Sequence, residues 1–297
     1  MFLDEEKVRA LLRMEELIPT MADALRELSA GKVEQPMRMV LPVAKHQGFF
    51  GVMPAYGGAL GAKMVTFYPN NQGIPTHHAI IMLFRPETGE PLVTMDGRLI
   101  TEMRTAAVSA VATDHLARTD TPVLAILGSG VQAQSHLEAL RIVRKFREVR
   151  VWSPRHAKEF ARKFGVSAVD SAEEAVRGAD VIVVATSATT PVLQGEWLSP
   201  GTHINAVGAT RPNWRELDDE VLRKSRIYVE SRDAATKESG DIIAAGNIFA
   251  ELGEVVAASK PGRQTDEEIT LYKSVGVAVE DIRSAELVYR RALVAGN

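Results

Sequence analysis

The 297 residues carry 35 Lys and Arg against 38 Asp and Glu, so a formal net charge of −3 gives no overall attraction to nucleic acid or to an anionic membrane. The chain has no cysteine, which excludes disulfides, thiolate nucleophiles and cysteine-ligated zinc, and its length suggests roughly two domains. No apolar run approaches the roughly 20 residues that span a bilayer, and the opening residues 1–6 lack the basic and apolar regions of a secretory signal. We therefore expect a cytoplasmic protein whose partners include neither a membrane nor a nucleic acid.

The N-terminal part is predicted to be a mostly antiparallel α+β domain. Residues 4–30 are typical of two helices, with Pro19 ending or starting one of them. Strands that follow one another directly favour antiparallel pairing. These strands are expected at Met37–Leu41, Phe49–Met53, Lys63–Tyr68, Ala79–Phe84 and Leu92–Thr94. An Ala-rich helix over Thr101–Leu116 follows, and a long helix over Val275–Ala295 is expected to pack back on this domain.

From Thr121-Pro122 onward the pattern changes to strands that alternate with helices. This alternation indicates an α/β domain with a Rossmann-type, doubly wound parallel sheet. The expected strands are Val123–Leu127, Val149–Trp152, Val181–Ala185, Ile204–Val207 and Ile227–Val229, and the helices between them include Val131–Val143 and Ala157–Phe164. We place the domain boundaries so that residues 1–118 with 275–297 form one domain and residues 119–274 the other.

A glycine motif follows the apolar strand at 123–127 and opens the next helix: Gly128-Ser129-Gly130-Val131-Gln132-Ala133. Gly128 permits the tight turn, Gly130 lets the backbone approach a pyrophosphate, and Ala133 allows close helix–strand packing. A plain strand–helix turn with small residues is the alternative, but the flanking strand and helix favour a dinucleotide site. We expect the whole motif to bind the cofactor, together with Thr186 and Val207 at the ends of two further strands.

The end of the second strand distinguishes NADP from NAD. An acidic residue there would bind the ribose hydroxyls of NAD, but this chain has Trp152-Ser153-Pro154-Arg155. Ser153 can donate a hydrogen bond to a 2′-phosphate, and Arg155 a charge-assisted one. The excess of Lys and Arg between residues 138 and 163 is mostly a solvated helix face. We predict NADPH as the cofactor, with NADH bound more weakly, and assign Trp152, Ser153 and Arg155 to its binding.

Three cations of the first domain have unfavourable surroundings. Arg38 shares a predicted strand face with Val40, and Lys63 shares one with Val65. Arg104 falls in the first turn of its predicted helix, where a cation opposes the helix dipole. Each alone is explained as an edge-strand charge or a side chain pointing into solvent. Together they can form a clamp for a carboxylate, with the arginines as two-pronged donors and Lys63 as a compact one.

Histidines give no sign of a metal centre. His77 aligns with Ala79 and Ile81 on one strand face, so a hydrogen-bonded core histidine is its default interpretation. None of the seven histidines has the spacing of a helical metal-binding pair, and no catalytic metal is predicted.

Long motifs in order along the chain carry a resemblance to the ornithine cyclodeaminase/mu-crystallin family, closest to its mu-crystallin (ketimine reductase) branch. They are Gln35-Pro-Met-Arg-Met-Val-Leu-Pro, Gly51-Val-Met-Pro-Ala-Tyr, Lys63-Met-Val-Thr-Phe-Tyr, Met95-Asp-Gly-Arg-Leu-Ile-Thr-Glu-Met-Arg-Thr, Leu127-Gly-Ser-Gly-Val-Gln-Ala-Gln-Ser-His, His203-Ile-Asn-Ala-Val-Gly-Ala, Trp214-Arg-Glu-Leu-Asp-Asp-Glu, Lys237-Glu-Ser-Gly-Asp and Phe249-Ala-Glu-Leu-Gly-Glu-Val.

The resemblance implies a homodimer in which residues 1–118 with 275–297 supply the substrate pocket and the dimer interface, while residues 119–274 bind the dinucleotide. It matches Arg38, Lys63 and Arg104 to carboxylate-binding positions, and His77 and Glu238 to pocket positions. In ornithine cyclodeaminases of the family, an aspartate in the loop after the Asn-Ala-Val-Gly strand handles the substrate amine. Here that loop carries Thr210, as mu-crystallins carry a small hydroxyl residue.

The function expected from these observations is the NADPH-dependent reduction of cyclic ketimines, such as piperideine- or pyrroline-2-carboxylate, to cyclic L-amino acids. Lys63, Arg104, Thr210 and Glu238 are the candidate catalytic residues. Lys63, or a water held by Thr210 or Glu238, is the candidate proton donor. Two alternatives remain: an amino-acid dehydrogenase or ornithine cyclodeaminase, and an NADPH-dependent protein that binds a thyroid-hormone-like ligand or serves as a crystallin.

Overall fold

The computed structural model describes residues 1–295, which divide into two compact units. One unit contains residues 1–104 and the chain from Gly276 onward, and the other is Thr105–Val275. From the sequence, the boundaries were predicted after residues 118 and 274. The first boundary in the structure lies inside helix α3 (Arg98–Leu116): the helix up to Arg104 belongs to the first unit, and the rest of it to the second. No helix within residues 1–295 is long and apolar enough to cross a membrane.

The first unit is built on a six-stranded sheet in the order β1-β6-β5-β4-β3-β2. The strands are β1 Phe2–Leu3, β2 Met39–Val43, β3 Gly48–Tyr56, β4 Leu60–Phe67, β5 His77–Phe84 and β6 Pro91–Asp96, with a short 3₁₀ turn η1 at Ala44–His46. Neighbours from β2 to β6 pair antiparallel, and β1 runs parallel to β6. The expectation of a mostly antiparallel sheet is confirmed.

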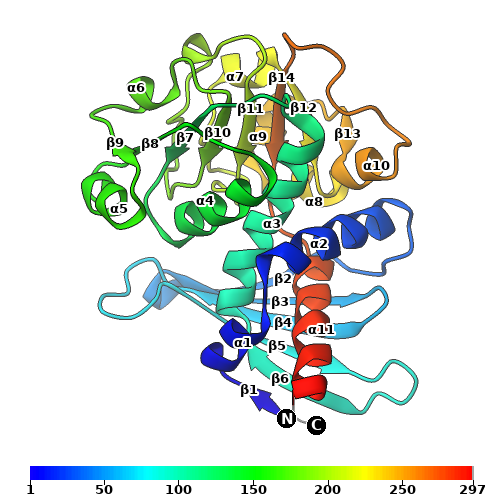
Figure 1. The fold of residues 1–297 in the computed structure, drawn as a ribbon. Helices are drawn as coiled ribbons and strands as arrows, with labels where there is room; N and C mark the ends of the chain where they lie inside the picture. Colours follow the sequence, from blue (N-terminus) through cyan, green and yellow to red (C-terminus); the bar gives the residue numbers. More distant parts are fainter. Residues whose placement is uncertain (296–297) are drawn as a thin grey trace. The chain divides into compact units, whose positions relative to one another are not determined.

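Three helices complete the first unit: α1 (Glu5–Leu11), α2 (Met14–Ser29) and the C-terminal α11 (Ala278–Ala295). Helix α11 contacts β3, β4 and β5 as well as both N-terminal helices (Figure 1). The end of the chain therefore covers a sheet that is formed by the N-terminal part.

Pro19 does not end or start a helix, contrary to expectation, because it lies inside α2. Its ring removes one backbone hydrogen bond of the helix. Leu17, Met21 and Leu25 are fully buried on the inner side of α2, and their packing outweighs that loss. The break between the two helices comes earlier, where Leu12 and Arg13 are extended.

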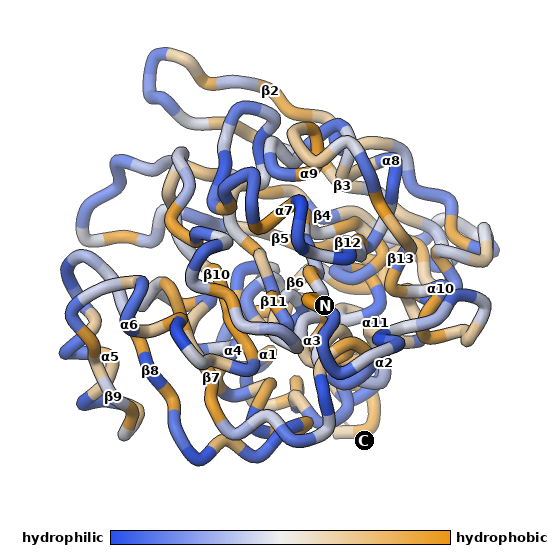
Figure 2. The backbone as a smooth tube through the Cα atoms, turned by 90° about the horizontal axis from the view of Figure 1, so that it is seen from above, coloured by the Kyte–Doolittle hydropathy of each residue, from blue (hydrophilic) through white to orange (hydrophobic). Residues whose placement is uncertain are grey.

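The second unit is an eight-stranded parallel sheet in the order β13-β12-β14-β11-β10-β7-β8-β9. Its strands are β7 Val123–Leu127, β8 Glu148–Trp152, β9 Ser167–Ala168, β10 Val181–Val184, β11 His203–Ala206, β12 Ser225–Val229, β13 Ala250–Glu251 and β14 Ile269–Lys273. All four residues of β10 are buried, so both faces of the sheet are covered. Figure 2 shows β7 and β10 largely in the hydrophobic colour. The expected Rossmann-type fold is confirmed.

The order of strands reverses between β7 and β10, because the chain runs outward through β8 and β9 and returns to the other side of β7. Ligands of such sheets bind at the carboxyl ends of the strands beside this switch point. The helices are α4 Val131–Val143, α5 Ala157–Phe164, α6 Ala172–Val176, α7 Asp219–Lys224, α8 Arg232–Glu238, α9 Gly240–Ala245 and α10 Leu252–Val256, with a 3₁₀ turn η2 at Gly195–Trp197. The bounds of α4 and α5 are those the sequence predicted.

Strand β14 was missed in the sequence, although it lies between β11 and β12 in the sheet. It contains Thr270 and Lys273, which break the apolar pattern that identified the other strands. Both side chains are fully buried because they have polar partners: Thr270 bonds His203, and Lys273 lies 3.4 Å from Asp241. Partners distant in sequence thus make a polar strand acceptable in the core.

Gly128, at the end of β7, gives a test of this fold. Its φ is +120°, and an added Cβ would lie 2.3 Å from the carbonyl oxygen of Ala185. Gly128→Ala should therefore lower the free energy of unfolding by about 2 kcal/mol or more. Gly130→Ala is the matched control, because no atom lies within 4 Å of its added Cβ. Urea unfolding of both variants measures the difference, and an equal loss in the two would contradict the turn geometry.

Candidate functional site

Lys63 is the central cation of the first unit. It lies on β4, inside the sheet rather than at its edge, and is 2% exposed. The strand face that it shares with Gly61 and Val65 is buried, as the period-two pattern predicted. The interpretation of Lys63 as an edge-strand charge is therefore wrong.

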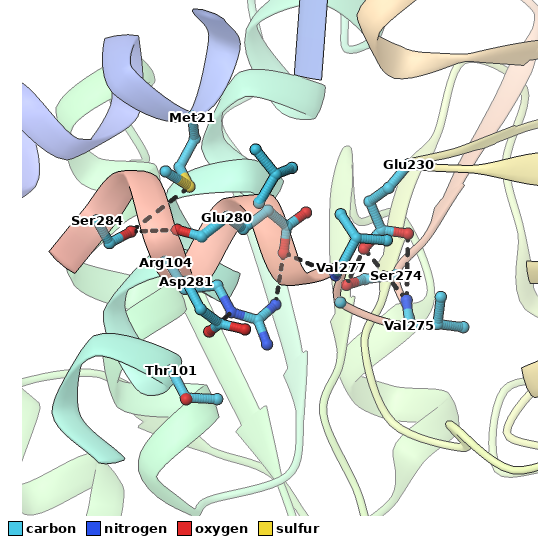
Figure 3. Close-up of polar contacts among 12 residues, drawn as sticks. Met21, Thr101, Arg104, Glu230, Ser274, Val275, Val277, Glu280, Asp281 and Ser284 are labelled. Atoms are coloured by element: carbon cyan, nitrogen blue, oxygen red, sulfur yellow. Dashed lines mark hydrogen bonds and ion pairs between the residues drawn. The ribbon is translucent and has the colours of Figure 1, made fainter. Parts of the chain in front are cut away.

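The first turn of α11 supplies the counter-charges for Lys63 and Arg104. Lys63 Nζ lies 2.5 Å from Asp281 Oδ2, and Arg104 Nε donates to Asp281 Oδ1 at 3.0 Å. Arg104 Nη1 donates to Glu280 Oε2 at 2.7 Å (Figure 3). The interpretation of Arg104 as a solvent-facing side chain is wrong, since it is 5% exposed. Glu280 and Asp281 were missed in the sequence, where two acids at a helix start indicate only a favourable helix dipole.

Arg104 and Arg38 do not occupy the places in helix α3 and strand β2 that the sequence predicted for them. Helix α3 begins at Arg98, so Arg104 lies in the second turn and the dipole argument does not apply to it. Arg38 precedes β2 rather than lying on it, and its Nη2 donates to the carbonyl of Gly276 at 2.5 Å. A Cβ on Gly276 would lie 2.6 Å from Arg104 Nη1, so this glycine brings the main chain against both guanidinium groups.

Three cations lie together in the first unit. Lys63 and Arg104 pair with Asp281, Arg104 also pairs with Glu280, and Arg38 lies close enough to lower the pKa of Lys63. Three cations in one place favour an anionic ligand such as a carboxylate. We call these five residues the cation group.

Burial and neighbouring charges set the protonation of the cation group. Burial lowers the pKa of Lys63 to about 8, with Arg104 and Arg38 acting in the same direction and Asp281 opposing them. Burial alone would raise the pKa of Asp281, but Arg104 and Lys63 together hold it below its ordinary value. Lys63 is therefore mostly protonated at neutral pH, yet it gives up its proton far more readily than an exposed lysine.

His77 lies at the start of β5 on the same face as Ala79 and Ile81, as predicted. Burial, and next the charge of Lys63, lowers the pKa of His77 to about 4. The imidazole is consequently neutral at physiological pH and adds no further charge to the cation group. Neither of its ring nitrogens has a hydrogen-bond partner within residues 1–295, which contradicts the interpretation of a hydrogen-bonded core histidine.

The glycine motif lies beside the switch point of the second unit. Gly130 is the N-cap of α4, and Ala133 is fully buried where that helix meets the sheet. Val131 is 53% exposed in the first turn, and the side chain of Gln132 is partly covered. The open space over Gly130 and the free amino terminus of a 13-residue helix fit the pyrophosphate of a dinucleotide.

The residues expected to select the cofactor lie beside this motif. The hydroxyls of Ser129 and Ser153 are 2.8 Å apart, and Gly128 N donates to the carbonyl of Trp152 at 2.8 Å. Arg155 is exposed and has no hydrogen bond or ion pair to any residue within 1–295. Its guanidinium is thus available to a phosphate, whereas Arg150 and Arg144, from the same basic stretch, are paired with Glu148 and Asp114.

Thr186 and Val207 follow β10 and β11 at the carboxyl edge of the sheet. The Thr186 hydroxyl points into the protein, where it donates to Glu216 Oε1 at 2.6 Å. Val207 is buried, and its N–H donates to the carbonyl of Val184 at 2.9 Å. The N–H of Thr186 also donates to Glu216, so contacts of these two residues with a cofactor would come from their carbonyl groups and carbon atoms.

Thr210 and Glu238 belong to the second unit, whereas Lys63 and Arg104 belong to the first. Thr210 is exposed in the loop after β11, and Glu238 is the partly buried last residue of α8. The two segments run against each other, since Gly240 N donates to the carbonyl of Arg211 at 3.0 Å.

Comparisons with known proteins agree with this geometry. The model of the ornithine cyclodeaminase/mu-crystallin family matches residues 1–296. The ketimine reductase mu-crystallin of Mus musculus is 51% identical over 304 residues, which cover 97% of this chain and 96% of that protein.

Two solved structures are similar over the whole chain. The Δ1-pyrroline-2-carboxylate reductase of Thermococcus litoralis, in complex with NADH and L-proline, has a TM-score of 0.95 and 43% identity, covering 100% of this chain and 98% of that one. An archaeal alanine dehydrogenase dimer with bound NAD has a TM-score of 0.94 and 38% identity, covering 100% and 97%. The chain belongs to the ornithine cyclodeaminase/mu-crystallin family.

Proposed function

We propose that this protein reduces cyclic ketimines, such as piperideine-2-carboxylate or pyrroline-2-carboxylate, to cyclic L-amino acids with NADPH. The observation that carries the proposal is the cation group, whose three clustered basic side chains, Lys63, Arg104 and Arg38, suit the carboxylate of an imino acid. The relatives support the reaction type, because the mouse protein is named a ketimine reductase and the Thermococcus enzyme a pyrroline-2-carboxylate reductase.

The cation group would bind and orient the substrate. Arg38 and Arg104 offer guanidinium groups to the two carboxylate oxygens, while Lys63 stays close to the imine. When NADPH is bound along the glycine motif, it supplies the hydride. Orientation by the carboxylate fixes the imine carbon for that transfer, which is an effect of positioning rather than of covalent chemistry.

Lys63 is the proposed proton donor to the imine nitrogen. It is protonated at neutral pH, and its pKa of about 8 brings it near the working range of a general acid. Asp281 Oδ2, 2.5 Å from Lys63 Nζ, holds this side chain in position. A water held by Thr210 or Glu238 is the alternative donor.

The preference for NADPH rests on the end of β8. Ser153 and the exposed, unpaired Arg155 stand where an NAD enzyme would have an acid, and no carboxylate follows Trp152 there to repel a 2′-phosphate. The structures of the two relatives contain NADH or NAD.

A homodimer formed through the first unit is part of the same proposal. The edge strand β2 exposes Met39, Val40 and Leu41, at 61%, 44% and 59%. A row of exposed apolar side chains on an unpaired sheet edge favours association with another chain. The dimeric alanine dehydrogenase supports a second copy as that partner.

A substitution at Arg155 tests the preference for NADPH over NADH. Arg155→Ala should weaken the binding of NADPH about tenfold and that of NADH little, because only NADPH carries the 2′-phosphate. Arg223→Ala is the control: it removes an exposed charge from α7, directly before β12 and so at the amino edge of the sheet. Titration of the reduced cofactors by fluorescence measures both constants. Equal weakening of NADPH and NADH by Arg155→Ala would argue against the assignment.

The pH dependence of imine reduction tests whether Lys63 is the proton donor. Because its pKa lies near 8, kcat/KM for imine reduction should fall as the pH rises through about 8, where Lys63 loses its proton. Lys63→Arg keeps the positive charge but does not titrate in this range, so its profile should lack that decline. The shape of the curve decides, because a larger side chain in a buried site will lower the rate at every pH. A decline at the same pH in the variant would assign it to another group.

Thr210 separates the proposed reaction from cyclodeamination of ornithine. The amine of ornithine has a pKa of roughly 10, and a threonine hydroxyl is neither a base nor a counter-charge for it. A preformed imine needs no such activation. We expect ammonia and proline release from ornithine to be negligible beside NADPH oxidation with cyclic imines. Thr210→Ser should preserve imine reduction and Thr210→Asp should slow it, whereas ornithine turnover at a rate near that of imines would refute the proposal.

A further inference from the structure

A second group of buried charges lies in the second unit, apart from the residues assigned above. Glu216, Asp241 and Lys273 are each fully buried, although they come from the segment before α7, from α9 and from the end of β14. Lys273 Nζ lies 3.4 Å from Asp241 Oδ2, and Asp241 Oδ1 accepts the backbone N–H groups of Glu216 and Leu217 at 3.1 and 3.2 Å.

The carboxylate of Glu216 lies between two loops at the carboxyl edge of the sheet. Its Oε1 accepts both the N–H and the hydroxyl of Thr186, at 2.8 and 2.6 Å, in the loop after β10. Both carboxylate oxygens lie 2.4 Å from the position of a Cβ on Gly208, in the loop after β11. Gly208 is therefore a position where the absence of a side chain makes room for a carboxylate.

The loop after β11 has a conformation that needs support. Ala209 has a φ of +50°, in the left-handed region, which costs a non-glycine residue of the order of 1 kcal/mol. On its inner side, Lys273 donates to the carbonyl of Gly208 and the Glu216 carboxylate fills the space beside Gly208. Thr210 follows Ala209 directly, so its position depends on these two buried contacts.

Burial makes this arrangement costly. It raises the pKa of Glu216 to about 7, against the opposing effects of Lys273 and Thr186. Arg215 adds a distant contact, with Nε 3.9 Å from Asp241, but it also pairs with Asp219. A buried ion network contributes little to stability compared with apolar packing of the same volume, so its effect here lies in the backbone groups that it fixes.

We propose that Glu216, with Lys273, is a positioning residue that couples the loop after β10 to the loop after β11 and thereby places Thr210 for imine reduction. The proposal rests on the proposed function in naming Thr210 as part of the reacting site. Glu216 is fully buried, touches neither substrate nor cofactor, and acts only through Thr186 and Gly208.

Two substitutions, one that enlarges Gly208 and one that shortens Glu216, test the coupling. Gly208→Ala pushes a methyl group into the carboxylate and should lower kcat at least about tenfold, since a displacement of the order of 1 Å at a reacting group can cost about a hundredfold. The KM for the imino acid, which the cation group determines, should change less than about threefold. Glu216→Asp shortens the side chain and should lower kcat when made alone. In the Gly208→Ala background it should restore kcat, because the shorter carboxylate leaves room for the methyl group.

Hydrogen–deuterium exchange gives a readout that needs no substrate. Gly208→Ala should speed exchange of the Thr186 amide, which lies in a different loop, and the double variant should slow it again. If the parent protein reduces no cyclic ketimine but shows this pattern, the coupling holds and the proposed function fails.

Glu216→Gln is used instead if Gly208→Ala does not fold. It keeps the shape of the side chain but removes its charge, and we expect the same faster exchange of the Thr186 amide and a lower kcat. Additive effects of the two substitutions, or variants with a lower melting temperature but unchanged kcat and exchange, would overturn the proposal.

Discussion

The ion pairs of Asp281 with Lys63 and Arg104 are the interaction on which the first unit depends. Neither cation can be buried without a counter-charge, because removing one partner of a buried ion pair costs several kcal/mol. The counter-charge lies on α11, which also covers β3, β4 and β5. Consequently the N-terminal sheet is complete only when the last helix of the chain has been added. A chain that ended at Arg104 would leave two cations facing an uncovered sheet.

The same ion pairs set the chemistry of the group. Arg38 adds a third cation beside Lys63 and Arg104, and its guanidinium donates to the carbonyl of Gly276. Asp281 also opposes the effect of burial on Lys63, so that the ammonium form persists at neutral pH. Asp281 is thus both the counter-ion of the buried cations and a group that sets the pKa of Lys63.

Features determined by neighbouring residues could be predicted from the sequence. Helix α4 begins and ends where expected because the glycine motif and the apolar spacing are local signals, and the apolar face that Lys63 shares with Val65 followed from alternation along one strand. Features that depend on remote partners could not. Arg104 and Asp281 are 177 positions apart, so no pattern around either residue reveals the pair. Strand β14 was missed for the same reason, because Thr270 and Lys273 find their polar partners on other elements.

The two charge groups differ in their contacts, and this difference separates what they can do. In the cation group three basic side chains, Lys63, Arg104 and Arg38, lie together, which suits an anionic ligand. In the group around Glu216 two acids, Glu216 and Asp241, face Lys273 and an arginine shared with Asp219. Its hydrogen bonds go mainly to the main chain, at Thr186, Gly208 and Leu217. A group of this kind holds loops in place, and the two loops that it holds begin at the carboxyl ends of β10 and β11, where a Rossmann sheet binds its ligand.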